Sequence, residues 1–226
     1  MKQRLASLAL LAVAASWGLT FVTMKDALNR QSVNSFLFYR FAIAAVVLLI
    51  IHPQIIRKLN WDVIKHGGIP GLFLGAGFIV QTYGLHMTTA AVTGFITGLY
   101  VVATPLFEQI FGGKKLGLMV WISIAIATTG LALLSLHGAR IGFGEFLVLL
   151  CALFYTGQII GLSKWSAGRD VWTMTFVQIL VVAIMTGIAS LIEGFQSPPD
   201  SGVWGVILFT ALVCTVTAFI VQTWSQ

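Results

Sequence analysis

Apolar stretches about 18 to 22 residues long recur along this chain of 226 residues, with short polar breaks between them. A helix of that length crosses the roughly 30 Å hydrocarbon core of a bilayer. Lipid satisfies no free backbone groups, so each stretch is predicted to be a transmembrane helix. The predicted spans are 5–24, 34–51, 68–85, 91–111, 116–136, 143–162, 171–192 and 203–223.

The composition excludes an ordinary soluble domain. Hydrophobic residues make up 58% of the chain and charged residues only 9%, whereas a soluble domain carries about 25% charged residues. So few charges cannot cover a globular surface, because large exposed apolar patches drive association. The predicted fold class is therefore all-α and integral to the membrane, a bundle of about eight transmembrane helices.

The basic residues predict how the chain lies in the membrane. If the N-terminus is cytoplasmic, nine basic residues fall in inside segments and three, Lys25, Arg30 and Arg140, fall outside. This is the positive-inside pattern, and it accounts for the net charge of +6 without nucleic acid as a partner. We expect a multi-pass protein of the cytoplasmic (inner) membrane with its N-terminus in the cytoplasm. The inside residues are Lys2, Arg4, Arg57, Lys58, Lys65, Lys114, Lys115, Lys164 and Arg169.

An internal repeat divides the chain. The sequence FIVQTY at residues 78–83 recurs as FIVQTW at residues 219–224, an offset of 141 residues. The first unit contains five predicted spans, and an odd number of spans gives the second unit the opposite orientation. Inverted repeats of this kind are typical of secondary transporters. We expect a first repeat at 1–141 and a second, with three of its five helices, at 142–226.

The repeat also predicts a longer version of the same architecture. Adding the offset to Leu136 places the end of a full second repeat at or beyond about residue 277. We therefore expect the eight spans to be a truncated form of a ten-helix (5+5) fold, either as a piece of a longer chain or as a product without the last two helices.

Several segments resemble the EamA-type transporters of the drug/metabolite transporter superfamily. The segments are ASWGLTF at 15–21, FYRF at 38–41, and QTYGL at 81–85 with its continuation through 88–90 to 105–107. One departure is Gly113–Lys114, where many members carry Gly–Glu. The resemblance implies ten helices in two inverted five-helix repeats with cytoplasmic termini. It also implies transport of small metabolites such as amino acids, nucleobases and drugs.

Polar residues within the spans are candidates for contact with a substrate. A charged residue at the centre of a transmembrane helix costs about 2.5–3.5 kcal/mol on insertion scales, so Arg40 is a candidate for binding a substrate carboxylate or phosphate. The alternative is a guanidinium bonded to neighbouring carbonyls. Gln81 and Gln222 occupy equivalent positions in the two repeats, which predicts that both face the central axis. Amides there can also connect helices.

Aromatic residues and one carboxylate complete the candidate site. The residues predicted to form an aromatic wall around the substrate are Trp17, Tyr83, Tyr100, Tyr155 and Trp224, although aromatic residues also collect at bilayer interfaces. Glu108 lies well inside a predicted span and is a weak candidate for proton coupling. Its alternative role is an ion pair with a lysine just after that span.

These features together predict a secondary transporter that moves a small organic metabolite or drug by alternating access between two inverted repeats. The alternative is a channel or a non-transporting membrane subunit. We expect no enzyme, because HExxH and GxSxG motifs are absent. We also expect no metal or cofactor, because Cys151 and Cys214 lie in apolar runs. The expected partners are the lipid bilayer, a small-molecule substrate, with proton coupling left open, and a second copy of the chain in a homodimer.

Overall fold

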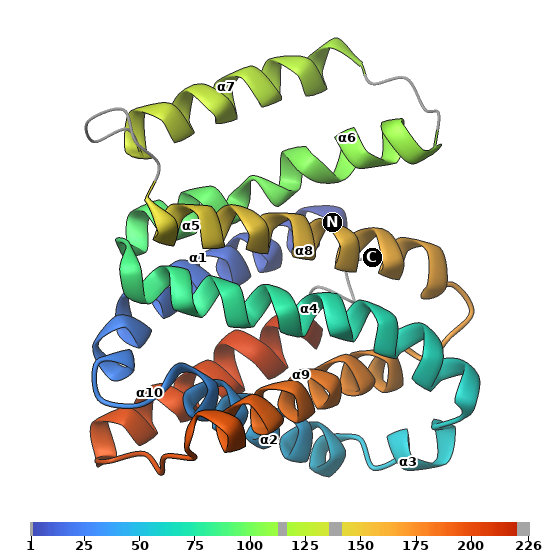
Figure 1. Ribbon diagram of the computed structural model, residues 1–226. Coiled ribbons are helices and arrows are strands. Elements are labelled where there is room, and N and C mark those ends of the chain that lie inside the picture. Colours follow the sequence, from blue (N-terminus) through green and yellow to red (C-terminus); the bar gives the residue numbers. More distant parts are fainter. Residues whose placement is uncertain (1, 113–116, 136–141, 221–226) are drawn as a thin grey trace.

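The long apolar runs form long helices in the computed structural model, which describes residues 2–112, 117–135 and 142–220 (Figure 1). Those ranges contain no strand. The α-helices are α1 (Lys2–Leu28), α2 (Val33–Ile51), α3 (Ile55–Lys58), α4 (Trp61–Met87), α5 (Ala90–Gly98), α6 (Tyr100–Gly112), α7 (Leu118–Ser135), α8 (Phe143–Trp165), α9 (Val171–Glu193) and α10 (Ser201–Ala211). A π-helix, Leu212–Thr217, continues α10.

Six helical segments among the described residues are long and apolar enough to cross a membrane. They are Val33–Ile51, Trp61–Met87, Ala90–Ile110, Phe143–Trp165, Val171–Glu193 and Ser201–Ile220. The run Leu118–Gly130 within α7 is a shorter apolar helix, and the 27-residue α1 covers the first predicted span. The predicted all-α membrane bundle is therefore confirmed.

The fourth span is interrupted at a place that the sequence did not predict. A kink is expected at Pro105, because proline removes one backbone hydrogen bond. The structure instead ends α5 at Gly98, turns at Leu99 and begins α6 at Tyr100, and α6 continues through Pro105. Glycine is second only to proline as a helix breaker, so Gly98 accounts for the position of the turn.

Side-chain caps explain where several helices begin. Asn60, Asp170 and Asp200 each accept a hydrogen bond from the backbone amide three residues later, at the start of α4, α9 and α10. Thr89 does the same for α5. Such caps satisfy amides that have no partner within the helix.

The helices alternate in direction along one axis (Figure 1). In that view α1, α4 and α9 run from right to left, whereas α2, α8 and α10 run from left to right. Helices of the first half thus run opposite to their counterparts in the second half: α1 to α8, α2 to α9, and α4 to α10.

The core forms where the two halves meet. The most extensive contacts join α4 with α8, α2 with α9, and α4 with α9. Its largest fully buried side chains include Phe36, Phe41, Leu48, Ile179 and Ile207. The central position of α4 follows from its glycines, which let a neighbouring helix approach closely.

The spacing of four residues in Gly71–Gly75 and in Gly94–Gly98 predicts two close helix contacts, and only the first pair makes one. A Cβ on Gly71 would lie 3.0 Å from the Val181 side chain, and one on Gly75 would lie 2.6 Å from the Met185 sulfur. These two residues therefore form a close contact with α9. Gly94 and Gly98 differ, because Gly98 has no atom within 4 Å of an added Cβ and both residues line a cavity.

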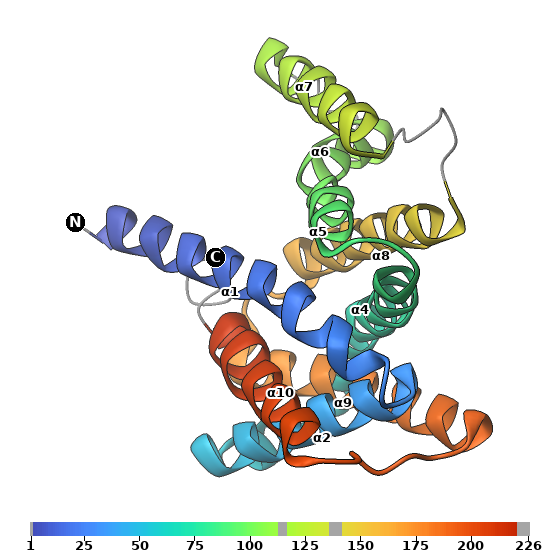
Figure 2. The same cartoon turned by 90° about the vertical axis from the view of Figure 1, so that its left-hand side faces the viewer.

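α7 lies at one side of the molecule, against α6 and α5 (Figures 1 and 2). Its apolar side chains are largely exposed, and Leu118, Met119 and Leu133 all exceed 70%. An apolar surface of this extent is compatible with lipid as the surrounding solvent.

Candidate functional site

A cavity of about 350 Å³ lies between α1, α2, α4, α5, α6, α8 and the C-terminal end of the helical segment Ser201–Ile220. This volume is within the range of small-molecule binding sites. Five of the predicted site residues line the cavity: Trp17, Arg40, Gln81, Tyr100 and Tyr155. The further polar and aromatic lining residues are Thr20, Phe21, Phe78, Thr82, Thr97, Gln158 and Phe219.

Arg40 projects from α2 and is only 2% exposed. Its Nε donates to the Thr215 hydroxyl at 3.0 Å, and its Nη1 lies 3.4 Å from the Met24 sulfur. The guanidinium carbon lies 5.2 Å from the ring centroids of both Phe41 and Phe78. Cation–π contacts of this kind stabilise a charge that has left water.

The π-helix supplies two of the polar contacts at the cavity. The Trp17 indole donates to the Cys214 carbonyl oxygen at 2.9 Å. In a regular α-helix that carbonyl would accept from the amide of Ala218, but the Ala218 amide donates to the Thr215 carbonyl instead. The π-helix thus offers a backbone acceptor to α1 and the Thr215 hydroxyl to Arg40, and π-bulges are frequent at functional sites.

A chain of hydrogen bonds fixes the amide of Gln81. Its Nε2 donates to the Thr97 hydroxyl at 2.9 Å, and its Oε1 accepts from the Tyr155 hydroxyl at 3.0 Å. The Tyr155 ring also lies edge-on to Tyr100, with centroids 6.3 Å apart. Tyr155 was expected in the aromatic wall, and it lines the cavity. Its spacing of three residues from Gln158 puts both on one face of α8.

The remaining predicted site residues lie elsewhere. Tyr83 is outside the cavity lining and contacts Asn34 and Glu193 near one end of the bundle. Glu108 is exposed on α6 and also lies outside the lining. Gln222 and Trp224 fall outside the described residues. The structure thus brings Trp17, Arg40, Gln81 and Tyr100 together and separates Tyr83 and Glu108 from them.

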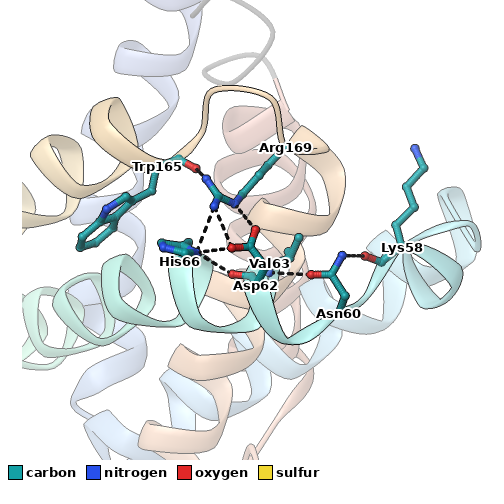
Figure 3. A network of polar contacts seen from close by, with 7 residues as sticks. All are labelled: Lys58, Asn60, Asp62, Val63, His66, Trp165 and Arg169. Atoms are coloured by element: carbon teal, nitrogen blue, oxygen red, sulfur yellow. Dashed lines mark hydrogen bonds and ion pairs between the residues drawn. The ribbon is translucent and has the colours of Figure 1, made fainter.

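A polar cluster joins the two halves of the chain at the end where α4 begins (Figure 3). We call Lys58, Asp62, His66, Arg169 and Asp170 the Asp62 cluster. Arg169 donates to both oxygens of the Asp62 carboxylate, from Nε at 2.6 Å and from Nη2 at 2.9 Å. The His66 Nδ1 lies 3.0 Å from Asp62, and Lys58 Nζ lies 2.5 Å from Asp170.

Ion pairing shifts the pKa values of Arg169 and Asp170, the two residues of the Asp62 cluster that lie in the loop before α9. The hydrogen bond to Asp62 raises the pKa of Arg169 above its ordinary value. Burial alone would raise the pKa of Asp170, but hydrogen bonds from Lys58 and Thr173 outweigh it and hold this pKa below the ordinary value. Arg169 and Asp170 are therefore both charged at neutral pH.

A second polar cluster joins the halves at the opposite end. We call Arg30, Asn34, Tyr83, Glu193 and Asp200 the Asp200 cluster. Arg30 pairs with Asp200 at 2.6 Å, while Glu193 accepts from Asn34 at 2.9 Å and from Tyr83 at 3.1 Å. The Val203 amide and the nearby Arg30 hold the pKa of Asp200 below its ordinary value, so it is ionised at neutral pH.

Comparisons with known proteins give a consistent result. The model of the EamA-like transporter family matches residues 4–136 and 142–226. A protein of Archaeoglobus fulgidus named "Uncharacterized transporter" is 30% identical over 231 residues, covering 100% of this chain and 71% of the relative. One crystal structure of a protein with 20% identity has a TM-score of 0.69 and covers 97% of this chain and 77% of its own. At this identity the likeness of the two structures concerns the fold.

Proposed function

Because the chain belongs to the EamA-like transporter family, we propose that it is a secondary transporter that moves a small organic metabolite or drug across the cytoplasmic membrane by alternating access. Family membership by itself supports the general conclusion that this is a multi-pass membrane transporter with a small-molecule substrate. It does not favour a channel or a non-transporting subunit. Nor does it point to an enzyme.

The observation that carries the proposal is the cavity around Arg40. It lies deep among apolar helices and combines a buried guanidinium, a fixed amide at Gln81 and the indole of Trp17. Polar groups at membrane depth are costly and mark substrate or ion pathways. In this proposal Arg40, Gln81, Trp17 and Tyr100 contact the substrate. Gln222 is a proposed contact as the repeat equivalent of Gln81, whereas Trp224 is not, because its equivalent Tyr83 lies outside the cavity lining.

The helix directions support an inverted repeat of 1–141 with 142–226. The capping residues Asn60 and Asp200 are 140 residues apart, whereas Phe78 and Phe219 are 141 apart. The π-helix at Leu212–Thr217 lies between Asp200 and Phe219 and adds one residue to that helix. One structural insertion therefore accounts for the difference between the two offsets.

The two polar clusters suggest how access could alternate. Each cluster pairs an arginine from the loop between the first two helices of one repeat with an aspartate at the start of the third helix of the other. These pairs are Arg30 with Asp200 and Arg169 with Asp62. In this proposal one cluster separates while the other stays closed, so the cavity opens to one side at a time. Tyr83 contributes to the closed state of the Asp200 cluster through its hydrogen bond to Glu193.

The distribution of basic residues supports a cytoplasmic N-terminus. α3, which ends at Lys58, and the loop between α8 and α9, which contains Arg169, lie at the end of the bundle where α1 begins (Figure 1). In this orientation the Asp62 cluster faces the cytoplasm and the Asp200 cluster faces outward.

The proposal is tested by transport in proteoliposomes that contain the purified full chain. The vesicles are loaded with a defined mixture of organic acids, amino acids and nucleobases, and efflux is followed by mass spectrometry. We expect at least one compound to leave with saturable kinetics. Arg40→Ala and Gln81→Ala should lower this flux at least about tenfold, since each removes polar contacts to the substrate. Arg57→Ala, on the exposed face of α3, is the matched control.

Two outcomes would contradict the proposal. One is flux that rises without saturation, which indicates a pore. The other is normal flux in both Arg40→Ala and Gln81→Ala, which removes the cavity as the binding site.

A further inference from the structure

The charge of the cavity is not balanced by its own lining. Arg40 is the one lining residue, among those that the structure describes, with a side chain that is charged at neutral pH. No Asp or Glu of the described residues takes part in the lining. A buried cation without an opposite charge is strongly unfavourable, so the site favours an occupant that brings a negative charge.

The contacts of Arg40 hold the guanidinium in place and leave part of it available. Nε is bound to Thr215 and Nη1 lies against a thioether sulfur, which is a weak acceptor. Within the described residues, Nη2 has no hydrogen-bond partner. The rings of Phe41 and Phe78 lie beside the guanidinium, but they carry no opposite charge and accept no conventional hydrogen bond. An oxyanion would satisfy the free N–H groups, because guanidinium geometry matches two oxygens of one group.

The rest of the cavity predicts the body of the ligand. Rings of Trp17, Phe21, Phe78, Tyr100 and Phe219 make up much of its lining. Aromatic rings pack favourably against other rings and apolar groups. A volume of about 350 Å³ is suited to a ligand of one or two rings.

We propose that this cavity binds a monovalent organic anion, with an oxyanion group on Arg40 and an aromatic or apolar body among the surrounding rings. The inference rests on the proposed transport function, and it names the substrate class of the same cavity. Cations are repelled by Arg40. A divalent anion is disfavoured, because its second charge would be buried without a partner.

Binding is measured by isothermal titration of the purified full chain with four probes of similar size. They are benzenesulfonate, benzenesulfonamide, phenyltrimethylammonium and benzene-1,3-disulfonate, which are respectively monovalent, neutral, cationic and divalent. We expect benzenesulfonate to bind at least about tenfold more tightly than the other three. Hydrogen bonds to charged groups are typically worth enough for about a 10- to 100-fold effect.

Variants assign the preference to the cavity. Arg40→Gln should weaken benzenesulfonate binding about 10- to 100-fold, and Arg57→Gln should not change it. Gln81→Glu is the second variant, because a carboxylate there still accepts the hydrogen bond from Tyr155. The Thr97 hydroxyl, which accepts from the Gln81 amide in the wild type, can turn its own proton towards a carboxylate. Gln81→Glu should weaken benzenesulfonate binding and strengthen phenyltrimethylammonium binding. Misfolding cannot turn a preference for the anionic probe into a preference for the cationic probe. Gln81→Glu therefore tests the inference even if Arg40→Gln does not fold.

The inference is overturned if the cationic or neutral probe binds as tightly as benzenesulfonate, if none of the four probes binds, or if folded Arg40→Gln binds benzenesulfonate like the wild type. Saturable efflux of another compound alongside any of these results would leave the transport function standing. Conversely, Arg40-dependent binding of benzenesulfonate without flux of any compound would support the anion site and contradict transport.

Discussion

Arg40 shows how one residue can be costly for insertion and still be stable in place. The cost of about 2.5–3.5 kcal/mol at mid-helix is offset by burial against two aromatic rings and by a hydrogen bond to Thr215. Thr215 is available because it belongs to the π-helix, where its hydroxyl also donates to the Thr210 carbonyl five residues back. The site therefore depends on a local departure from α-helical geometry.

The Trp17 indole should hold α1 against the π-helix. Trp17→Phe keeps an aromatic ring and removes the N–H that donates to Cys214. We expect a loss of about 1 kcal/mol, and hence about fivefold faster labelling of Cys214 by N-ethylmaleimide, followed by mass spectrometry. Cys151 is buried on α8 and serves as the internal control. Unchanged labelling of Cys214, or equal acceleration at Cys151, would contradict this role.

Asp200 should make the stability of the protein depend on acidic pH. The pKa of Asp200 is lower in the folded protein than its ordinary value, so its stabilising effect is present above about pH 4 and is lost as pH falls through the folded pKa. Asp200→Asn can still cap α10 but cannot pair with Arg30. We expect the melting temperature of the wild type to fall more steeply than that of Asp200→Asn between pH 5 and 3. Parallel curves would show that the ion pair is without effect.

The helices were predictable from the sequence because lipid admits few alternatives to a long apolar helix. The π-helix was not, since its polar groups bond to Trp17 and Arg40 on distant helices. The turn at Leu99 was missed because Pro105, a stronger helix breaker than Gly98, lies in the same span. Gln81 and Tyr83 illustrate the same limit at the site. Residues two positions apart on a helix point roughly 200° apart around its axis, so Gln81 and Tyr83 cannot both face one cavity. α4 is apolar on nearly all sides, and its orientation is set by the glycines that contact α9.

The polar clusters were also beyond sequence analysis, because each brings together residues more than 100 positions apart. In the sequence, their charged residues indicated only the orientation of the chain in the membrane. The sequence also places these residues at the ends of predicted spans, where side chains from different loops can form ion pairs.

Each cluster should control access from its own side. Gly98→Cys places a thiol in the cavity without a steric clash, in a background with Cys151→Ser and Cys214→Ala. We expect Asp62→Asn to increase labelling by an impermeant thiol reagent from the cytoplasmic side, and Asp200→Asn from the outer side. Exposed ion pairs are weak, so the increase should be about two- to fivefold. The pairs of Arg169 with Asp62 and Arg30 with Asp200 would thus act on opposite faces.

Glu108→Gln is the matched control for these variants, because Glu108 is exposed and lies outside both clusters. It should leave labelling unchanged from either side. An increase from the same side for both Asp62→Asn and Asp200→Asn would contradict alternating control by the two clusters.

At the scale of the whole molecule, the two ends resemble each other in their pairing. An arginine–aspartate pair lies at each end, at 2.6 Å in each case. In the proposed cycle, two states that exchange one such pair for the other would differ little in ionic interactions. A small free-energy difference between the states is what a transporter needs, because both must be populated during the cycle.

The charge of the substrate then decides what drives net movement. A monovalent anion carried alone moves one negative charge per cycle, and a potential of 100 mV changes its energy by about 2.3 kcal/mol. That energy sustains a gradient of about fiftyfold at equilibrium. An inside-negative potential would favour export of such an anion without a coupling ion. Glu108 lies away from the cavity lining, so no carboxylate in the described lining is placed to carry a proton with the anion.

We therefore expect electrogenic flux of benzenesulfonate in proteoliposomes. A potassium diffusion potential set with valinomycin, negative inside, should accelerate its efflux, and the opposite potential should slow it. A pH gradient at zero potential should have no effect, and Glu108→Gln should behave as the wild type. If the anion moved together with one proton, the cycle would carry no net charge. The potential would then leave the flux unchanged while the pH gradient drove it, and that result would contradict uncoupled export.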